Sequence, residues 1–195
     1  MMQSAAIGLS LFVGRATVAV VRGRRAAPEL VARFEVQLSD RWQSESAHPY
    51  HLELGRGGSQ GEGARERGCR AAEAGVRRAI RGLLEEMQER ALAPGGAGLV
   101  VVRPVDPARV PGAHARAHAA ERQLYLDAVL ACFAQADVPI VVSVDERVRA
   151  EAATRLRRRA QQIDAVLKAF VRAVGTPWRA PEKNAALAGW MSLPE

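Results

Sequence analysis

Residues 6–23 read Ala-Ile-Gly-Leu-Ser-Leu-Phe-Val-Gly-Arg-Ala-Thr-Val-Ala-Val-Val-Arg-Gly, and this stretch decides the fold. Its two halves, 6–13 and 16–23, are rich in Val, Ile, Ala and Phe, a composition typical of β-strands. The short Gly14-Arg15 connection predicts a tight turn, because glycine adopts the backbone angles that such turns require. We therefore expect the chain to begin with a β-hairpin.

The rest of the chain predicts an alternating α/β architecture. Residues 29–38 alternate apolar and polar side chains, as in a half-buried strand, and the apolar runs 98–102 and 138–143 are typical of strands buried on both faces. Helical periodicity covers 64–92, 115–136, 145–174 and 181–192, with Pro94-Gly95-Gly96 expected to stop the first helix and a break near Thr154 left open. This order predicts three antiparallel strands followed by parallel strands joined through helices.

Residues 39–63 have no clear period and carry Ser, Gly, His and Gln. They predict a loop-rich insertion within a single domain that spans 1–195, since the length suits one domain. Loops of this length in compact domains are often functional or disordered.

The composition indicates a basic, arginine-rich protein. The formal charge is +7, and because Lys168 and Lys183 are the only lysines, 26 of the 28 basic residues are arginine. Arginine binds phosphate well through its planar fork, so this balance is compatible with a nucleic-acid partner.

Cys69 and Cys132 fall on the apolar faces of predicted helices, so we expect buried free thiols. No apolar run approaches the roughly 18–20 residues needed to cross a bilayer. The N-terminus also lacks the pattern of a signal peptide. We therefore expect a cytoplasmic protein with no membrane partner.

Three motifs carry a resemblance to a known superfamily. They are Ile7-Gly-Leu-Ser10 on the first strand, Val100-Val-Val-Arg103 on the fourth, and Glu182-Lys-Asn-Ala-Ala-Leu-Ala-Gly-Trp190 on the last helix. Together with the element order, they resemble the ribonuclease H-like superfamily, and within it the RuvC-type Holliday-junction resolvases. The resemblance implies an α/β fold with a ribonuclease H-like mixed sheet flanked by helices.

The same resemblance bears on catalysis. In active members of the superfamily these three places carry acids, which hold two divalent cations that activate water and stabilise the leaving oxygen. Here the matching residues are Ser10, Arg103 and Asn184. Serine and asparagine are weak neutral ligands, and arginine cannot be a ligand. We therefore expect a degenerate metal site, with no catalytic residues, no metal and no cofactor.

Two alternatives to this interpretation stay open. A displaced site could use Asp106 and Glu182, which would make the protein a divergent structure-specific nuclease that depends on Mg²⁺ or Mn²⁺; otherwise both are solvated loop or cap residues. The actin and sugar-kinase folds begin with the same hairpin, so Gly8 and Gly14 could instead wrap a nucleotide phosphate. Those proteins use two such domains, and this chain has room for one.

The histidines form two pairs. His114 and His118 stand four residues apart with Glu121 three further on, a spacing that can chelate zinc on a helix. Because Pro111-Gly112 comes just before them, His114 could precede the helix, and we expect exposed, uncoordinated histidines. His48 and His51 are likewise expected to be polar loop residues.

The densest basic segment suggests the function. It contains Arg147, Arg149, Arg155, Arg157, Arg158 and Arg159, on a predicted helix, and Arg103 could join it at the former metal site. We expect a non-catalytic, ribonuclease H-like protein that binds DNA or RNA phosphates through this arginine-rich helix. A scaffold or assembly protein, with a protein partner or as a homodimer, is a further alternative.

Overall fold

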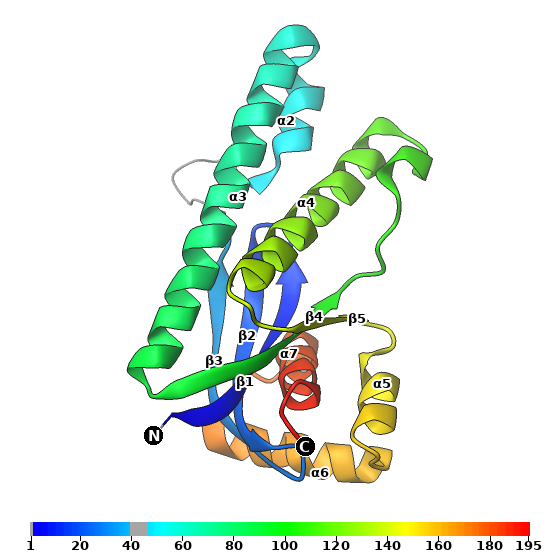
Figure 1. Cartoon of the computed structure of the whole chain (residues 1–195). Coiled ribbons are helices and arrows are strands. Elements are labelled where there is room, and N and C mark those ends of the chain that lie inside the picture. Colours follow the sequence, from blue (N-terminus) through cyan, green and yellow to red (C-terminus); the bar gives the residue numbers. More distant parts are fainter. Residues whose placement is uncertain (1, 40–46) are drawn as a thin grey trace.

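The computed structural model describes residues 2–39 and 47–195, and its centre is a five-stranded sheet in the order β3-β2-β1-β4-β5 (Figure 1). β1, β2 and β3 are antiparallel, while β4 runs parallel to β1 and β5 parallel to β4. The strands are β1 (Gln3–Phe12), β2 (Arg15–Arg24), β3 (Ala27–Gln37), β4 (Leu92–Val101) and β5 (Ile140–Val144). The predicted opening hairpin and the mixed α/β sheet are confirmed.

Strand β1 lies in the middle of the sheet, and its residues alternate between two separate hydrophobic cores. Ile7 and Leu9 pack in the core beneath α3 and α4, whereas Ala6 packs in the core beneath α7. This follows from the period of two, which sends successive side chains to opposite faces. Ser10 follows Ala6 by four residues on the strand, so the two side chains point to the same face of the sheet, the one that α7 covers.

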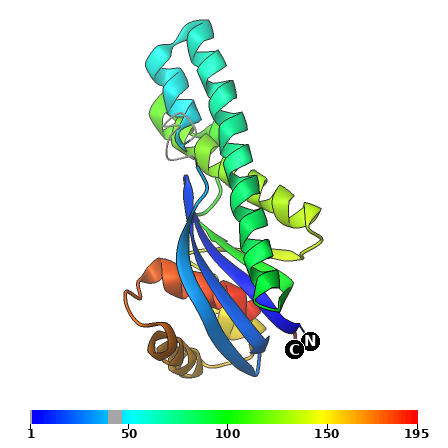
Figure 2. The same ribbon diagram turned by 90° about the vertical axis from the view of Figure 1, so that its left-hand side faces the viewer.

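Helices cover both faces of the sheet (Figures 1 and 2). One face carries α3 and α4, against which α2 packs, and the other carries α5, α6 and α7. The helices are α2 (Pro49–Arg56), α3 (Gly58–Glu89), α4 (Ala113–Gln135), α5 (Val148–Arg155), α6 (Ala160–Val174) and α7 (Ala180–Met191), with a short 3₁₀ helix η1 (Pro107–Arg109). None of the described helices is long and apolar enough to span a membrane.

The prediction of a loop-rich insertion at 39–63 was wrong for most of that range. Residues 40–46 lie outside the described part of the chain, but α2 occupies 49–56 and α3 begins at Gly58. Both helices extend past the end of the sheet, where they pair with each other (Figures 1 and 2). Glycine is needed at their contact, because a Cβ on Gly61 would lie 2.7 Å from the carbonyl oxygen of Glu53. Tertiary packing therefore overrides the low helix propensity of glycine.

Pro94, Gly95 and Gly96 do not end a helix, as the sequence had predicted, but lie inside β4. Helix α3 has already ended at Glu89, and the register between β1 and β4 slips at Gly95. Strand β5 pairs with β4 only from Ala97 onward. Pro94 therefore stands where β4 has one neighbour, and a missing N–H is tolerated at such an edge.

Helix α7 approaches the sheet so closely that glycines line the contact. A Cβ on Gly8 would lie 1.7 Å from the carbonyl oxygen of Ala185, and one on Gly98 would lie 2.3 Å from that of Ala188. Trp190 is fully buried in this core. The close approach brings the first turns of α7, including Asn184, beside the end of β1.

Cys69 on α3 and Cys132 on α4 are free thiols, and both are half-buried rather than fully buried. Burial raises the pKa of each thiol above its ordinary value. Both cysteines are therefore mainly protonated near neutral pH.

Candidate functional site

The carboxyl ends of the parallel strands β1, β4 and β5 lie next to the start of α7. A pocket of about 180 Å³ opens there, and its polar lining consists of Ser10, Asp145 and Asn184. Ser10 is buried and lies opposite Val100 in the parallel register of β1 and β4. The structure thus brings together Ser10 and Asn184, two of the three positions at which the sequence predicted a degenerate metal site.

This pocket contains a single carboxylate. Asp145 follows directly after β5, and its Oδ1 accepts a hydrogen bond from the backbone N–H of Glu146 at 2.8 Å. A pair of Mg²⁺ or Mn²⁺ ions needs several carboxylate oxygens to offset its charge. The described residues that line the pocket therefore do not fit two such ions.

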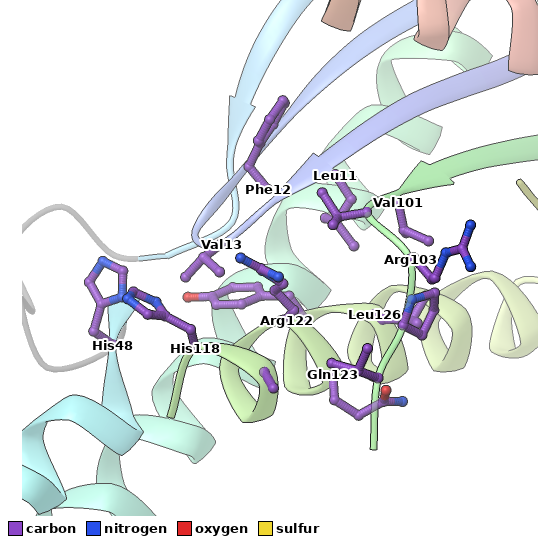
Figure 3. A pocket seen from close by; sticks show the side chains of 15 residues that line it. Leu11, Phe12, Val13, His48, Val101, Arg103, His118, Arg122, Gln123 and Leu126 are labelled. Carbon is purple, nitrogen blue, oxygen red and sulfur yellow. The ribbon is translucent and has the colours of Figure 1, made fainter. Parts of the chain in front are cut away.

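Arg103, the third predicted position, does not line this pocket. It lies two residues beyond the end of β4, and its Nη2 donates to Oε2 of Glu146 at 2.7 Å. Its side chain borders a larger cavity of about 300 Å³ between the ends of β1 and β4 and helix α4 (Figure 3). Arg103 is thus an exposed, ion-paired neighbour of the Ser10 pocket.

The larger cavity has mainly apolar walls and a basic rim. Val101 and Leu126 form part of its wall, and Figure 3 shows Arg103 on one side with His48 and His118 on the other. Tyr125 also lines it, and burial raises the pKa of this tyrosine to about 12. The pKa of His118 is lowered, first by burial and then by the nearby His51 and His114.

Asp106 and Glu182, the residues of the nuclease alternative, both lie outside the Ser10 pocket. Asp106 caps η1, where its Oδ1 accepts from the N–H of Ala108 at 3.0 Å. Glu182 accepts from the backbone N–H of Arg179 at 2.8 Å at the start of α7 and lies 3.6 Å from Arg33. Both carboxylates therefore have capping roles.

The segment that carries most of the predicted arginines is not one helix. Helix α5 ends at Arg155 and α6 begins at Ala160, so Arg157, Arg158 and Arg159 lie in the connection between them. The helix cannot continue because Arg157 adopts a left-handed backbone with φ of 50°. The helix break that the sequence left open near Thr154 therefore lies at 156–159, and Arg155 and Arg159 do not belong to one helix.

The seven predicted arginines divide into two groups. Arg103 pairs with Glu146, Arg149 pairs with Asp164 and lowers the pKa of that carboxyl group, and Arg158 donates to the carbonyl oxygen of Ala26. The other four of the seven, Arg147, Arg155, Arg157 and Arg159, are exposed and have no ion pair with a described residue. Arg147 precedes the first residue of α5, two residues after Asp145, and the others lie at or beyond the last residue of α5.

The nucleotide alternative does not suit the contacts of the two glycines. The face of Gly8 is closed by the backbone of α7, which leaves no room for a phosphate. Gly14 forms the hairpin turn with φ of 76°, and its carbonyl oxygen accepts from the N–H groups of Leu38 and Ser39. Both glycines are required for packing and turn geometry.

One polar residue of the Ser10 pocket, Asp145, was not predicted from the sequence. Asp145 carried a signal, because it directly follows an apolar run predicted to be a parallel strand, and such strand ends form sites. His114 is not placed before the helix, since α4 begins at Ala113. His114 and His118 therefore lie on successive turns of one helix.

Comparison with solved structures identifies the fold. RuvC from Thermus thermophilus matches with a TM-score of 0.51 and 12% identity, over 96% of this chain and 92% of that one. T. thermophilus RuvC in complex with a Holliday junction substrate matches with a TM-score of 0.53 and 11% identity, over 96% of this chain and 91% of that one. The yeast mitochondrial Holliday junction resolvase Ydc2 matches with a TM-score of 0.49 and 9% identity, over 98% of this chain and 81% of that one.

The chain therefore has a ribonuclease H-like fold of the RuvC type, as the sequence motifs had suggested. A comparison with protein-family models finds no match, and a comparison with curated proteins finds no relative. At 11–12% identity the structural likeness defines the fold and leaves the activity to be argued from the residues of this chain.

Proposed function

We propose that this protein binds nucleic acid with a RuvC-type fold and does not cleave it. The observation that carries the proposal is the lining of the pocket at the edge of the sheet. Ser10 and Asn184 stand there with one carboxylate, Asp145, where two-metal chemistry requires a cluster of acids. The complex of T. thermophilus RuvC with a Holliday junction substrate supports nucleic acid as the partner for this fold.

The proposed contacts to phosphate come from the four predicted arginines that have no ion pair with a described residue. Arg147 lies at the start of α5, and Arg155, Arg157 and Arg159 lie at its end. Eight helical residues separate these ends by about 12 Å, the axial length of three or four phosphates along one strand. The two ends of α5 are therefore spaced to contact one strand of a nucleic-acid backbone.

Electrostatics would provide most of the affinity in this proposal. The net charge of +7 attracts a polyanion, and arginine forks bind phosphate oxygens in pairs. Each neutralised phosphate releases counterions, so binding weakens as salt rises. Four such contacts on a duplex predict about a 100-fold loss of affinity for a fourfold increase in salt.

The test is a salt titration of binding to a fluorescently labelled four-way DNA junction, followed by anisotropy. One variant carries Arg147→Gln, Arg155→Gln, Arg157→Gln and Arg159→Gln. The matched control removes the same charge from exposed arginines of α3, through Arg67→Gln, Arg70→Gln, Arg77→Gln and Arg81→Gln. Circular dichroism checks that both variants fold.

We expect the first variant to bind at least about tenfold more weakly and with a shallower salt dependence, because it loses up to four phosphate contacts. The control variant should bind with nearly the affinity of the unmodified protein. The proposal is overturned if the unmodified protein does not bind at low salt, or if both variants lose the same affinity. The second result would mean that net charge alone drives the association.

A further inference from the structure

All four histidines of the chain meet at one place. His48 and His51 come from the start of α2, whereas His114 and His118 come from the first turns of α4. The ring of His51 lies 4.7 Å from that of His114 and 4.3 Å from that of His118, between centroids. Segments more than sixty residues apart in sequence thus form one cluster of imidazoles.

The nitrogen atoms of three rings have the spacing of metal ligands. Nε2 of His114 and Nε2 of His118 are 3.2 Å apart, and His51, His114 and His118 each offer one ring nitrogen such that the three nitrogens lie within 4.8 Å of one another. A tetrahedral zinc ion with Zn–N distances of 2.0–2.1 Å holds its ligands about 3.3–3.4 Å apart. Small rotations of the rings would bring all three nitrogens to that separation.

Glu121 prepares His51 for this role. Its side chain is fully buried, and its Oε1 accepts from Nδ1 of His51 at 2.8 Å. Because a carboxylate that accepts this bond fixes the proton on Nδ1, the other nitrogen, Nε2, keeps its lone pair. Nε2 of His51 is itself buried without a hydrogen-bond partner among the described residues.

An imidazole that donates one N–H to a buried carboxylate and directs the other nitrogen at a cation is a recurrent arrangement in metal sites. A second grouping, of His48, His51 and Glu121, also has ligand atoms within 4.8 Å. In that grouping the two oxygens of Glu121 already accept from the two histidines, at 3.0 Å from His48 and 2.8 Å from His51. Glu121 is therefore better suited to orient a ligand than to be one.

We propose that His51, His114 and His118 bind one divalent transition-metal ion, with zinc the best match to three imidazole nitrogens. Glu121 is a positioning residue that orients His51, and His48 is not a ligand. His114 is exposed and His118 is half-exposed, so the fourth coordination position faces solvent beside the larger cavity. The ion would join α2 to α4, and the inference does not rest on nucleic-acid binding.

The test uses full-length protein without a histidine tag, stripped of metal with a chelator. Isothermal titration with Zn²⁺ measures affinity and stoichiometry, and the visible absorption of Co²⁺ reports tetrahedral nitrogen coordination. The ligand variants are His51→Ala, His114→Ala and His118→Ala. The matched control is His48→Ala, which removes a histidine of the same cluster, and Glu121→Gln tests the positioning role.

We expect one ion per chain, a tetrahedral Co²⁺ spectrum, and a rise in thermal stability with Zn²⁺. Each ligand variant should lose at least about tenfold in affinity, Glu121→Gln about 10–100-fold, and His48→Ala little. His114 and His118 are accessible enough for their variants to fold even if His51→Ala does not. The proposal is overturned if metal-free protein does not bind Zn²⁺, or if His48→Ala weakens binding as much as His114→Ala.

Discussion

The buried carboxylate of Glu121 accepts two hydrogen bonds from His51, one from the ring Nδ1 at 2.8 Å and one from the backbone N–H at 3.3 Å. Helix α2 is only eight residues long, so contacts of this kind hold it against α4. Isolated helices of this length are not stable in water. The position of α2 therefore depends on a charge buried in the neighbouring helix.

Glu121→Ala should lower the unfolding free energy of the metal-free protein by about 2–4 kcal/mol. The change leaves the donors of His48 and His51 without their acceptor, and hydrogen bonds to charged groups are among the stronger ones. Urea denaturation measures the difference. Glu62→Ala, at an exposed position of α3, is the control and should stay within about 0.5 kcal/mol. Equal stabilities for the two variants would refute this role.

Gly8→Ala should destabilise the protein by about 3 kcal/mol or more. The added Cβ would lie 1.7 Å from the carbonyl oxygen of Ala185, so α7 would have to move away from β1. Gly82→Ala is the matched control, because a Cβ there meets nothing within 4 Å on α3 and should stabilise the helix by up to about 1 kcal/mol. Thermal or urea unfolding separates them, and a neutral Gly8→Ala would contradict the packing of α7.

Tyr125 should ionise only at strongly alkaline pH. Burial raises its pKa to about 12 from an ordinary value of 10.0. Between these values the unfolded chain binds fewer protons than the folded one, so the unfolding free energy should fall as pH rises through that window. Absorbance titration of tyrosinate, with near-ultraviolet circular dichroism to detect unfolding, measures this. Tyr125→Phe should remove the phase of the absorbance titration that occurs at the highest pH. If that phase persists in this variant, its assignment to Tyr125 is refuted.

Arg158→Ala should lower stability by about 1–2 kcal/mol, whereas Arg155→Ala should change it by less than about 0.5 kcal/mol. Arg158 donates to the carbonyl oxygen of Ala26 at 2.9 Å and lies 5.7 Å from the centre of the Trp190 ring. Arg155 is exposed and has no ion pair among the described residues. Chemical denaturation compares the two variants, and the opposite order of stabilities would show that Arg158 has no structural role.

Much of the fold could be predicted because its signals are local. The apolar composition of β1 and β2, the alternation along β3 and the Gly14 turn depend on near neighbours in sequence, and they indicated the sheet correctly. The helical character of 49–63 could not be read in this way. Its glycines disfavour a helix locally, and the contact that requires one of them, Gly61 against the backbone of Glu53, exists only in the folded structure.

For the candidate sites too, some residues could be predicted from sequence motifs, whereas others depend on contacts that form only in the folded structure. Ser10 and Asn184 were placed together because their motifs resemble a known fold. The histidine cluster was not predicted, since its two halves lie in segments that only tertiary packing brings together. A break in the helix of the arginine segment was left open near Thr154, but its position could not be fixed, because nothing in the composition indicates the left-handed residue Arg157.

A combined binding and cleavage assay on a labelled four-way DNA junction, in the presence of Mg²⁺ or Mn²⁺, tests directly whether this protein binds nucleic acid without cutting it. We expect a retarded complex whose DNA strands stay intact, because Asp145 is the single carboxylate among the described residues that line the pocket beside Ser10 and Asn184. Metal-dependent strand cleavage by the unmodified protein that is lost in Asp145→Asn would contradict it.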